Sequence, residues 1–334
     1  MESVEAPQRT PLQVGPATDS PVIATTTQAN AQRSFTVYDG MLLFMTVIWA
    51  ANPPAIKWAL QYIDPLAFNA IRFGLATLIL VTLVLVGKEN FRWRKGDGFK
   101  IVALGLLGHG LYQTLFILGA DNTLAGNVAL IVSINPAFIA VFSAIFGYER
   151  ISKYTWVGVS ITLMGVMLVV SGSGKPLELG SRLLGDLIIL VVTIMLALYT
   201  VLSQPFLKHY SSIKLNALTM PVGIAFLLVA ATPSLVQSAP SWPDVPGTAW
   251  LLLAMSGIFA VSISYIIWYK GVQKLGATRT SVYANIVPVL AALISFFILG
   301  EPLGWQFWAG MVLVITGVSL ARFGAKLVAR LRQA

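Results

Sequence analysis

The sequence has no cysteine and only two histidines, His109 and His209, in 334 residues. Disulfides, thiolate metal sites and a cysteine nucleophile are therefore excluded, and two histidines leave little material for a His-rich metal centre. We expect neither a metal nor another cofactor.

Charged residues are also scarce, at 10% of the chain, whereas an average soluble domain carries about 25%. Hydrophobic residues make up 57% of the chain, and the mean hydropathy is +0.79. A soluble protein of this length cannot bury so much apolar surface. The composition therefore predicts an all-α integral membrane protein surrounded by lipid.

The N-terminal region lacks a basic segment followed by an apolar core, so it is not a secretory signal. It is rich in Ala, Pro, Thr, Gln and Ser, a composition that favours disorder. We expect a disordered cytosolic tail at 1–36 and a basic cytosolic tail at 323–334.

Ten apolar runs are long enough to cross a bilayer. A crossing takes about 20 residues, because a helix rises 1.5 Å per residue across a hydrocarbon core of about 30 Å. The runs lie near 38–60, 65–87, 99–119, 124–147, 154–171, 186–206, 215–233, 247–269, 279–299 and 304–322.

The distribution of Lys and Arg predicts the orientation of these spans. If the N-terminus is cytosolic, 18 of the 22 basic residues lie on the cytosolic side, and only Lys175 and Arg182 lie outside. Lys57 and Arg72 fall within spans. We therefore expect a multi-pass protein of the cell inner membrane with both termini in the cytosol. The net charge of +9 follows from this topology, so we expect no nucleic-acid partner.

The chain also contains an internal repeat. A shift of 152 residues superposes identical residues in seven pairs: Gly119 and Gly271, Ala125 and Ala277, Pro136 and Pro288, Glu149 and Glu301, Trp156 and Trp308, Gly158 and Gly310, and Gly165 and Gly317. The earlier spans fit a shift of 147, which pairs Asp39 with Asp186. Because each half has five spans, the second half must enter the membrane from the opposite side. We expect two inverted five-helix repeats, at 37–172 and 186–322, joined by an external loop at 173–185. Inverted repeats are a transporter architecture with the substrate site at the midplane.

Two pairs of segments resemble a known family. The runs IWAANPPAIKWAL and PLAFNAIRFGLA resemble the first two spans of an EamA domain. The runs NPAFIAVFSAIFGYERISKYTWVGVSITLMGVMLVV and NIVPVLAALISFFILGEPLGWQFWAGMVLVITGVSL resemble its last two spans. The resemblance covers about residues 38 to 322 and implies membership of the drug/metabolite transporter superfamily. Its EamA members mostly export amino acids and other small metabolites.

Small and acidic residues of the repeat suggest structural roles. Gly158, Gly165, Gly310 and Gly317 recur seven apart on one helix face, which is typical of close helix packing in lipid. Glu149 and its counterpart at position 301 lie where helix ends meet turns, so we expect them to cap helices.

Pro136 and Pro288 lie inside spans four and nine. Each removes a backbone hydrogen bond and bends its helix. The bend has two interpretations, either simple packing of a bent helix or a hinge for alternating access, and the symmetric placement of the pair favours the hinge.

Lys57 and Arg72 are cations placed within spans. Charges at membrane depth are costly and face a cavity or a partner. Lys57 is close enough to the helix end to snorkel, whereas Arg72 lies about 10 Å inside from Pro65 at 1.5 Å per residue. Two roles stay open for Arg72: an ion pair, with Asp64 as the nearest acid in sequence, or contact with a substrate carboxylate.

A polar and aromatic stripe on span three predicts a substrate site. His109, Tyr112, Gln113 and Phe116 share one helix face, and lipid would leave their polar groups unpaired. The substrate-lining set that we predict is Trp49, Asn52, His109, Tyr112, Gln113, Phe116, Tyr199, Tyr265, Trp268 and Tyr283.

Energy coupling is less defined by the sequence. His109 is the mid-span group that titrates near neutral pH, so it is a possible proton site, and uncoupled facilitation is the competing mechanism.

The functional hypothesis is a carrier that exports neutral or aromatic amino acids by alternating access. Alternatives are a carrier for drug-like, nucleotide-sugar or lipid-linked solutes and, remotely, a membrane-embedded enzyme, which lacks the required catalytic groups at membrane depth. We expect a small-molecule substrate, a lipid bilayer environment, no enzyme activity, and a monomer or weak dimer.

Overall fold

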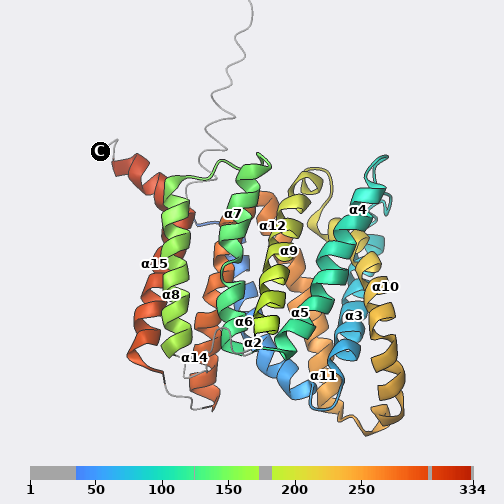
Figure 1. The fold of residues 1–334 in the computed structure, drawn as a ribbon. Coiled ribbons are helices and arrows are strands. Elements are labelled where there is room, and N and C mark those ends of the chain that lie inside the picture. The colour runs from blue at the N-terminus through green and yellow to red at the C-terminus, as the bar shows by residue number, and fades with distance from the viewer. Residues whose placement is uncertain (1–34, 124, 173–182, 300–302, 332–334) are drawn as a thin grey trace, which may run out of the picture. The chain divides into compact units, whose positions relative to one another are not determined.

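The computed structural model describes residues 35–123, 125–172, 183–299 and 303–331. These residues form helices joined by short connections (Figure 1). In the first half, the bounds are α2 Val37–Ala59, α3 Pro65–Val86, α4 Gly98–Gly105, η1 Leu106–Leu111, α5 Tyr112–Asp121, α6 Ala125–Val132, α7 Asn135–Ile145 and α8 Lys153–Gly172. In the second half, they are α9 Leu183–Leu207, α10 Ser212–Ser238, η2 Ala239–Asp244, α11 Gly247–Met255, η3 Ser256–Ile263, α12 Ser264–Leu275, α13 Ala277–Ser281, η4 Val282–Ile286, α14 Val287–Leu299 and α15 Trp305–Leu331.

These elements make the ten predicted spans, because α4–η1–α5, α6–α7, α11–η3–α12 and α13–η4–α14 each run on as one span. Within the described residues, nine helices are long and apolar enough to cross a membrane. The exception is α2, which has 23 residues but contains Pro53 and Pro54. Those prolines, together with Asn52 and Lys57, lower its hydropathy below that of the other spans.

The last helix extends beyond its predicted end. The sequence pattern placed the end of this span at residue 322, but α15 continues to Leu331. The added segment, AKLVARL after Gly324, consists mostly of strong helix formers and has no proline. Most of the expected basic C-terminal tail is therefore helical. Residues 1–34, nearly all of the expected N-terminal tail, lie outside the described residues, as do 173–182 of the expected linker.

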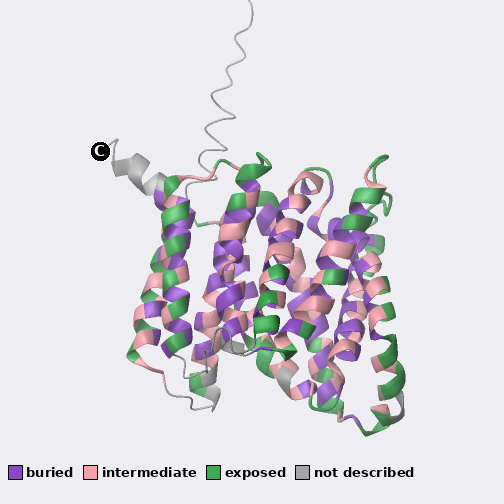
Figure 2. Ribbon diagram, viewed as in Figure 1, coloured by how far each residue is buried: buried purple, intermediate pink, exposed green. Residues whose placement is uncertain are grey.

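The contacts between the halves follow the inverted repeat. In the first half α2 packs on α12 and α14, and in the second half α9 packs on α5 and α7, which are the repeat counterparts of those helices. In the same way α3 contacts η3 while α10 contacts η1. Other cross-half contacts join counterparts directly, such as α3 with α10 and α8 with α15. Large hydrophobic side chains such as Met164 on α8 and Val229 on α10 are exposed, as lipid contact requires. Figure 2 shows exposed residues along both of these helices.

The four repeated glycines form the crossing of α8 and α15. A Cβ atom on Gly165 would lie 2.7 Å from the backbone nitrogen of Val314 and 2.9 Å from the carbonyl oxygen of Gly310. Gly158, Gly310 and Gly317 likewise face the backbone of the partner helix. The packing role predicted for these glycines is confirmed, since any larger residue would push the two backbones apart.

We expect Gly165→Ala to lower the free energy of unfolding by about 1–3 kcal/mol, the usual cost of overpacking a close contact. The measurement is thermal unfolding of the purified protein in detergent. Gly247→Ala is the matched control, because a Cβ atom there meets nothing within 4 Å. Equal melting temperatures for the two variants would contradict the role of the crossing.

Candidate functional site

Spans three and eight each contain a π-helical segment at repeat-related positions. The segment η1 covers Leu106–Leu111 and η3 covers Ser256–Ile263, and a shift of 152 carries the first onto residues 258–263. π-helical turns inside α-helices are frequent at functional sites, because they redirect side chains locally. His109 lies in the first segment and Ser256 in the second, and each is part of a buried polar network.

The first network is centred on His109, which is fully buried. The His109 Nε2 atom lies 2.7 Å from the Tyr199 hydroxyl and 3.2 Å from Thr219 Oγ1. Its Nδ1 atom has no hydrogen-bond partner among the described residues. The network therefore joins η1 of the first half to α9 and α10 of the second.

The second network is centred on Arg72, which is 8% exposed. Its Nη2 donates to Asn69 Oδ1 at 2.7 Å, and its Nη1 donates to Ser256 Oγ at 3.3 Å. Ser256 in turn donates to Asn52 Oδ1 at 2.8 Å. The network joins α3 and α2 of the first half to η3 of the second.

The two networks occupy equivalent places in the inverted repeat. The 147 shift that relates the first two spans of each half places Asn52 on Tyr199 and Arg72 on Thr219. The first network therefore uses spans six, seven and three, and the second uses spans one, two and eight. The chemistry differs: one network contains a guanidinium group and the other contains neutral hydroxyl groups and an imidazole.

The expected ion pair between Arg72 and Asp64 does not form. Asp64 instead caps α3, since its Oδ1 accepts from the backbone nitrogens of Leu66 and Ala67 at 2.9 and 3.2 Å. Among the described residues, no Asp or Glu forms a salt bridge with Arg72. The side chain of Lys57, the other predicted cation, lies outside the described residues.

Aromatic side chains connect the two networks. The Tyr265 ring lies 5.5 Å from the His109 ring and 6.3 Å from the Phe73 ring, centroid to centroid. The Phe73 ring also lies 5.1 Å from the Arg72 guanidinium carbon. Gln113 Nε2 donates to the Tyr265 hydroxyl at 3.1 Å, so the stripes of spans three and eight meet as a direct cross-half contact.

Other predicted residues lie around this centre. The Trp49 and Trp268 rings are 5.5 Å apart, and Trp49 Nε1 donates to the carbonyl of Ala260 at 3.1 Å. Tyr112 and Phe116 stack on each other at 6.0 Å on the half-buried side of α5. Most of the predicted lining residues thus lie near the two networks.

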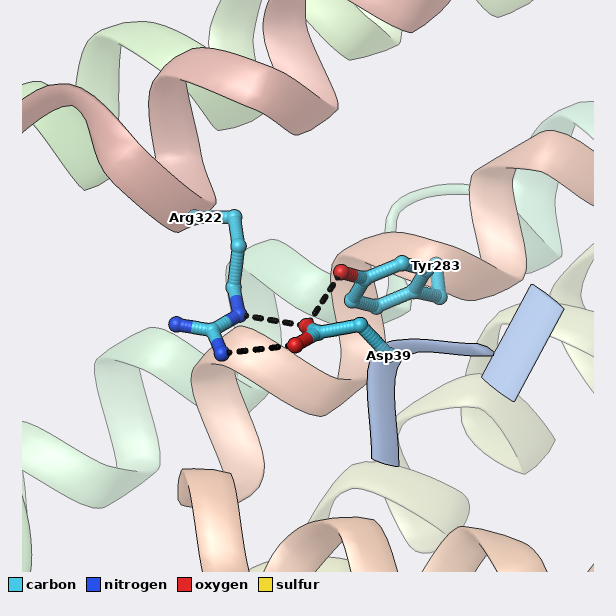
Figure 3. Close-up of polar contacts among 3 residues, drawn as sticks. All are labelled: Asp39, Tyr283 and Arg322. Carbon is cyan, nitrogen blue, oxygen red and sulfur yellow. Dashed lines mark hydrogen bonds and ion pairs between the residues drawn. The ribbon is translucent and has the colours of Figure 1, made fainter. Parts of the chain in front are cut away.

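Tyr283 is the exception, because it belongs to a separate network at the start of α2. Its hydroxyl donates to Asp39 Oδ1 at 2.6 Å, and Arg322 holds both carboxylate oxygens at 2.8 and 3.1 Å (Figure 3). Asp39 precedes Trp49 by ten residues of helix, or about 15 Å. Arg322, which the charge count had placed in the cytosolic set, is a buried residue of α15 that is 3% exposed.

A second buried carboxylate joins two spans by hydrogen bonds at the opposite end of the bundle. Asp186, the repeat counterpart of Asp39, lies in the first turn of α9. Its Oδ1 accepts from Thr123 Oγ1 at 2.5 Å and from Asn127 Nδ2 at 2.9 Å. We call these networks the two end clamps, the Asp39 clamp and the Asp186 clamp. Each ties the first span of one half to the fourth span of the other.

Glu149 supports the Asp39 end. Its carboxylate accepts from the backbone nitrogens of Ala277 and Thr278, at 2.5 and 3.3 Å, where α13 begins. The capping role predicted for Glu149 is confirmed, and the helix that it caps lies in the other half. The counterpart, Glu301, lies outside the described residues.

Spans four and nine are interrupted next to the two symmetric prolines. In span four, α6 ends at Val132 and α7 begins at Asn135, next to Pro136. In span nine, the 3₁₀ segment η4 ends at Ile286, two residues before Pro288. A proline cannot donate to the preceding turn, so both helices change geometry at positions that the repeat makes equivalent.

The sequence reasoning missed several members of the networks. Asn69 lies three residues before Arg72 on the same helix face, so helical spacing could have identified it. Thr219 and Ser256 had no such signal, since small hydroxyl residues are common in membrane helices and mostly bond to their own backbone. Across the described ranges, no group of three or more His, Cys, Asp or Glu residues is placed to hold a metal ion.

Comparison with known proteins gives one family. The model of the EamA-like transporter family matches residues 37–171 and again residues 183–323. A solved crystal structure shares the fold at a TM-score of 0.72 and 18% identity, covering 88% of this chain and 98% of the other.

Curated relatives from bacteria and archaea match over most of their length. The transporter YyaM of Bacillus subtilis, named as uncharacterized, is 32% identical over 285 residues, which are 84% of this chain and 92% of the relative. A transporter of Archaeoglobus fulgidus, also named as uncharacterized, is 29% identical and covers 83% of this chain and 96% of its own. A probable terminal-alkyne amino-acid exporter of Streptantibioticus cattleyicolor is 24% identical and covers 84% of this chain and 91% of its own. With both halves matched by one family model, the chain belongs to the EamA-like transporter family.

Proposed function

We propose that the protein is a secondary transporter that exports small metabolites, neutral or aromatic amino acids in particular, across the inner membrane by alternating access. The observation that carries this proposal is the pair of buried polar networks, on Arg72 and His109, between the two halves. Charged and polar groups at membrane depth mark substrate pathways. The relative named as a probable amino-acid exporter supports the substrate class.

The chemistry of the site suits a zwitterion with an apolar or aromatic side chain. The guanidinium group of Arg72 offers charge for a carboxylate, and the amide oxygens of Asn52 and Asn69 are acceptors that suit an ammonium group. Tyr265 and the Trp49–Trp268 pair provide aromatic faces for stacking. A nucleotide sugar would require more cations than Arg72, which is the one cation in the two networks.

Alternating access requires elements that bend and contacts that break. We assign the bending to Pro136 and Pro288, where spans four and nine are interrupted at repeat-equivalent positions. We assign the breakable contacts to the two end clamps. Opening one end while the other stays closed would expose the networks to each side of the membrane in turn.

A transport assay in proteoliposomes tests the function directly. We expect efflux of at least one neutral or aromatic amino acid from a panel. An imposed pH gradient then separates the two coupling mechanisms: it accelerates efflux if His109 carries a proton and leaves the rate unchanged if transport is uncoupled. Lack of transport of every panel member would rule out this substrate class.

Paired variants locate the site within the protein. Tyr265→Ala removes a half-buried ring of the site and should reduce efflux by tenfold or more, since it deletes the ring contacts to His109 and Phe73 and the hydrogen bond from Gln113. Leu78→Ala is the control, because that side chain is 64% exposed on the lipid side of α3. Equal efflux by both variants would place the site elsewhere.

The clamps can be tested with single cysteines because the chain has none of its own. The reporters are Ser281→Cys in α13 and Ala129→Cys in α6, which are related by the 152 shift. Each lies in the span that carries part of the clamp at its end of the bundle. An impermeant maleimide applied from each side measures how open that end is.

Two matched variants each delete one hydroxyl that donates to a clamp carboxylate. Tyr283→Phe should raise labelling at position 281 about tenfold, and Thr123→Val should do the same at position 129, because a hydrogen bond to a charged group contributes about 1.5–3 kcal/mol. Each variant should leave labelling at the opposite reporter unchanged or lower. A rise at both reporters in either variant would indicate general loosening and contradict alternation.

A further inference from the structure

We propose that Arg72 is the receptor for the substrate's carboxylate, so that the transporter requires a free carboxylate on its cargo. This inference rests on the proposed function and specifies its substrate class. It starts from the depth of the side chain: Arg72 is buried in α3, about 10 Å along the helix from Pro65. A cation at that depth needs compensation from its surroundings.

The compensation within the protein comes from neutral groups. Arg72 donates to an amide oxygen of Asn69 and to the hydroxyl of Ser256, and its guanidinium carbon lies 5.1 and 5.6 Å from the Phe73 and Phe68 ring centres. In the part of the chain that the structure describes, no carboxylate pairs with it. Phenyl faces and neutral oxygens attract a cation, but less strongly than an anion does.

One nitrogen of the guanidinium group makes no hydrogen bond at all within the described residues. The Arg72 Nε atom is buried and has no hydrogen-bond partner among the described residues. A buried unpaired donor is costly, and native structures rarely keep one without a reason. The Nε–H and the adjacent Nη–H form a parallel pair of donors that matches the two oxygens of a carboxylate. A bound carboxylate would supply both the missing charge and the missing acceptor.

Arg72 lies between the two halves of the protein, where an alternating-access carrier is expected to bind its substrate. Ser256, which accepts from Arg72, lies in η3 of the second half, and Asn52, which accepts from Ser256, lies in α2 of the first. The guanidinium group is therefore held where elements of both halves meet. An anion bound there would contact the interface that has to rearrange during transport.

The inverted repeat gives an independent argument. At the equivalent place in the other half the chain has Thr219, and Asn216 there corresponds to Asn69. Both Asn69 and Asn216 are buried, but Asn69 Oδ1 accepts from Arg72 whereas Asn216 Nδ2 donates to the carbonyl of Ser212 in its own helix. The two positions therefore match in burial and differ in the guanidinium group. Because the guanidinium group is present at only one of the two equivalent positions, the positive charge lies on one side of the site. Binding of a zwitterion in a fixed orientation requires such an asymmetry.

The test compares each amino acid with its amide, which has the same side chain and lacks the carboxylate. The probes are phenylalanine and phenylalaninamide, with leucine and leucinamide as a second pair. Efflux and binding to the purified protein are both measured. We expect the wild-type protein to prefer the acid over the amide by a factor on the order of 10 to 100, the range expected for a hydrogen bond to a charged group.

Arg72→Gln should abolish this preference, but removal of a buried cation can also affect folding. Asn69→Asp avoids that problem, because it keeps the size of the side chain and places a carboxylate where Asn69 Oδ1 now lies, 2.7 Å from Arg72 Nη2. This internal anion would occupy Arg72 in place of the substrate. We expect the acid-to-amide ratio to fall tenfold or more while the protein stays folded.

Asn122→Asp is the matched control, since Asn122 is exposed at the end of α5 and its side chain donates to the carbonyl of Leu118, one turn earlier in the same helix. It introduces the same charge without approaching Arg72 and should keep the wild-type ratio. Ser256→Ala should raise the KM for the acid and leave that for the amide unchanged, because Ser256 positions Arg72.

The outcomes separate this inference from the function. Equal transport of acid and amide by the wild-type protein, or an unchanged ratio in Asn69→Asp, would overturn the role of Arg72 and leave amino-acid export intact. Wild-type protein that neither binds nor transports any amino acid would overturn both the substrate class and this inference. A preference that is lost in Asn69→Asp and kept in Asn122→Asp would establish it.

Discussion

Every charge inside the bilayer must be compensated without water, and this constraint organises the rest of the structure. The buried charges are compensated in different ways. Arg322 pairs with Asp39 through two hydrogen bonds, so both side chains can be almost fully buried. Arg72 is held by neutral groups of three elements instead. The first arrangement pairs opposite charges within the protein, whereas the second holds a cation with neutral groups.

The inverted repeat determines where such groups lie. Because one half enters the membrane in the opposite direction, several structural features occur twice, once toward each end. Asp39 and Asp186 begin equivalent spans and hold opposite ends of the bundle, and Pro136 and Pro288 interrupt equivalent helices. The small-residue crossing of α8 and α15 joins counterparts to each other. That crossing involves backbone contact along much of both helices, so it is suited to remain intact while the ends open and close.

The sequence predicts the ten spans, the repeat and the faces of spans three and eight, because each depends on local periodicity or on composition. The partners of individual side chains depend on tertiary packing. Arg72 and Ser256 are 184 residues apart, and no local pattern relates them. Asp64 was the nearest acid to Arg72 in sequence, but its helix needs a cap, and that local role is satisfied first. Arg322 resembles a loop cation in a charge count because its partner, Asp39, lies at the other end of the chain.

Tyr283 is a second residue whose partner could not be predicted from the sequence. It is a tyrosine in a membrane span, and its type and burial match those of a lining residue. Its function is decided by the neighbouring carboxylate of Asp39, which binds the hydroxyl at 2.6 Å. The hydrophobic pattern determines which helix face is buried, but the facing helix determines whether a polar group on that face serves a clamp or a substrate.

These features suggest how binding and conformational change are coupled. The Arg72 Nη1 contact to Ser256 is a 3.3 Å bond between a cation and a neutral hydroxyl, and it joins α3 of one half to η3 of the other. A substrate carboxylate is a stronger acceptor than a hydroxyl, so it would compete for the donors of Arg72 and weaken this contact between the halves. A ligand shifts a conformational equilibrium only by binding one state more tightly than the other. Replacement of the Ser256 hydroxyl by the substrate carboxylate as the acceptor of Arg72 would change a contact between the two halves. This exchange would make the affinity for substrate differ between the two conformations.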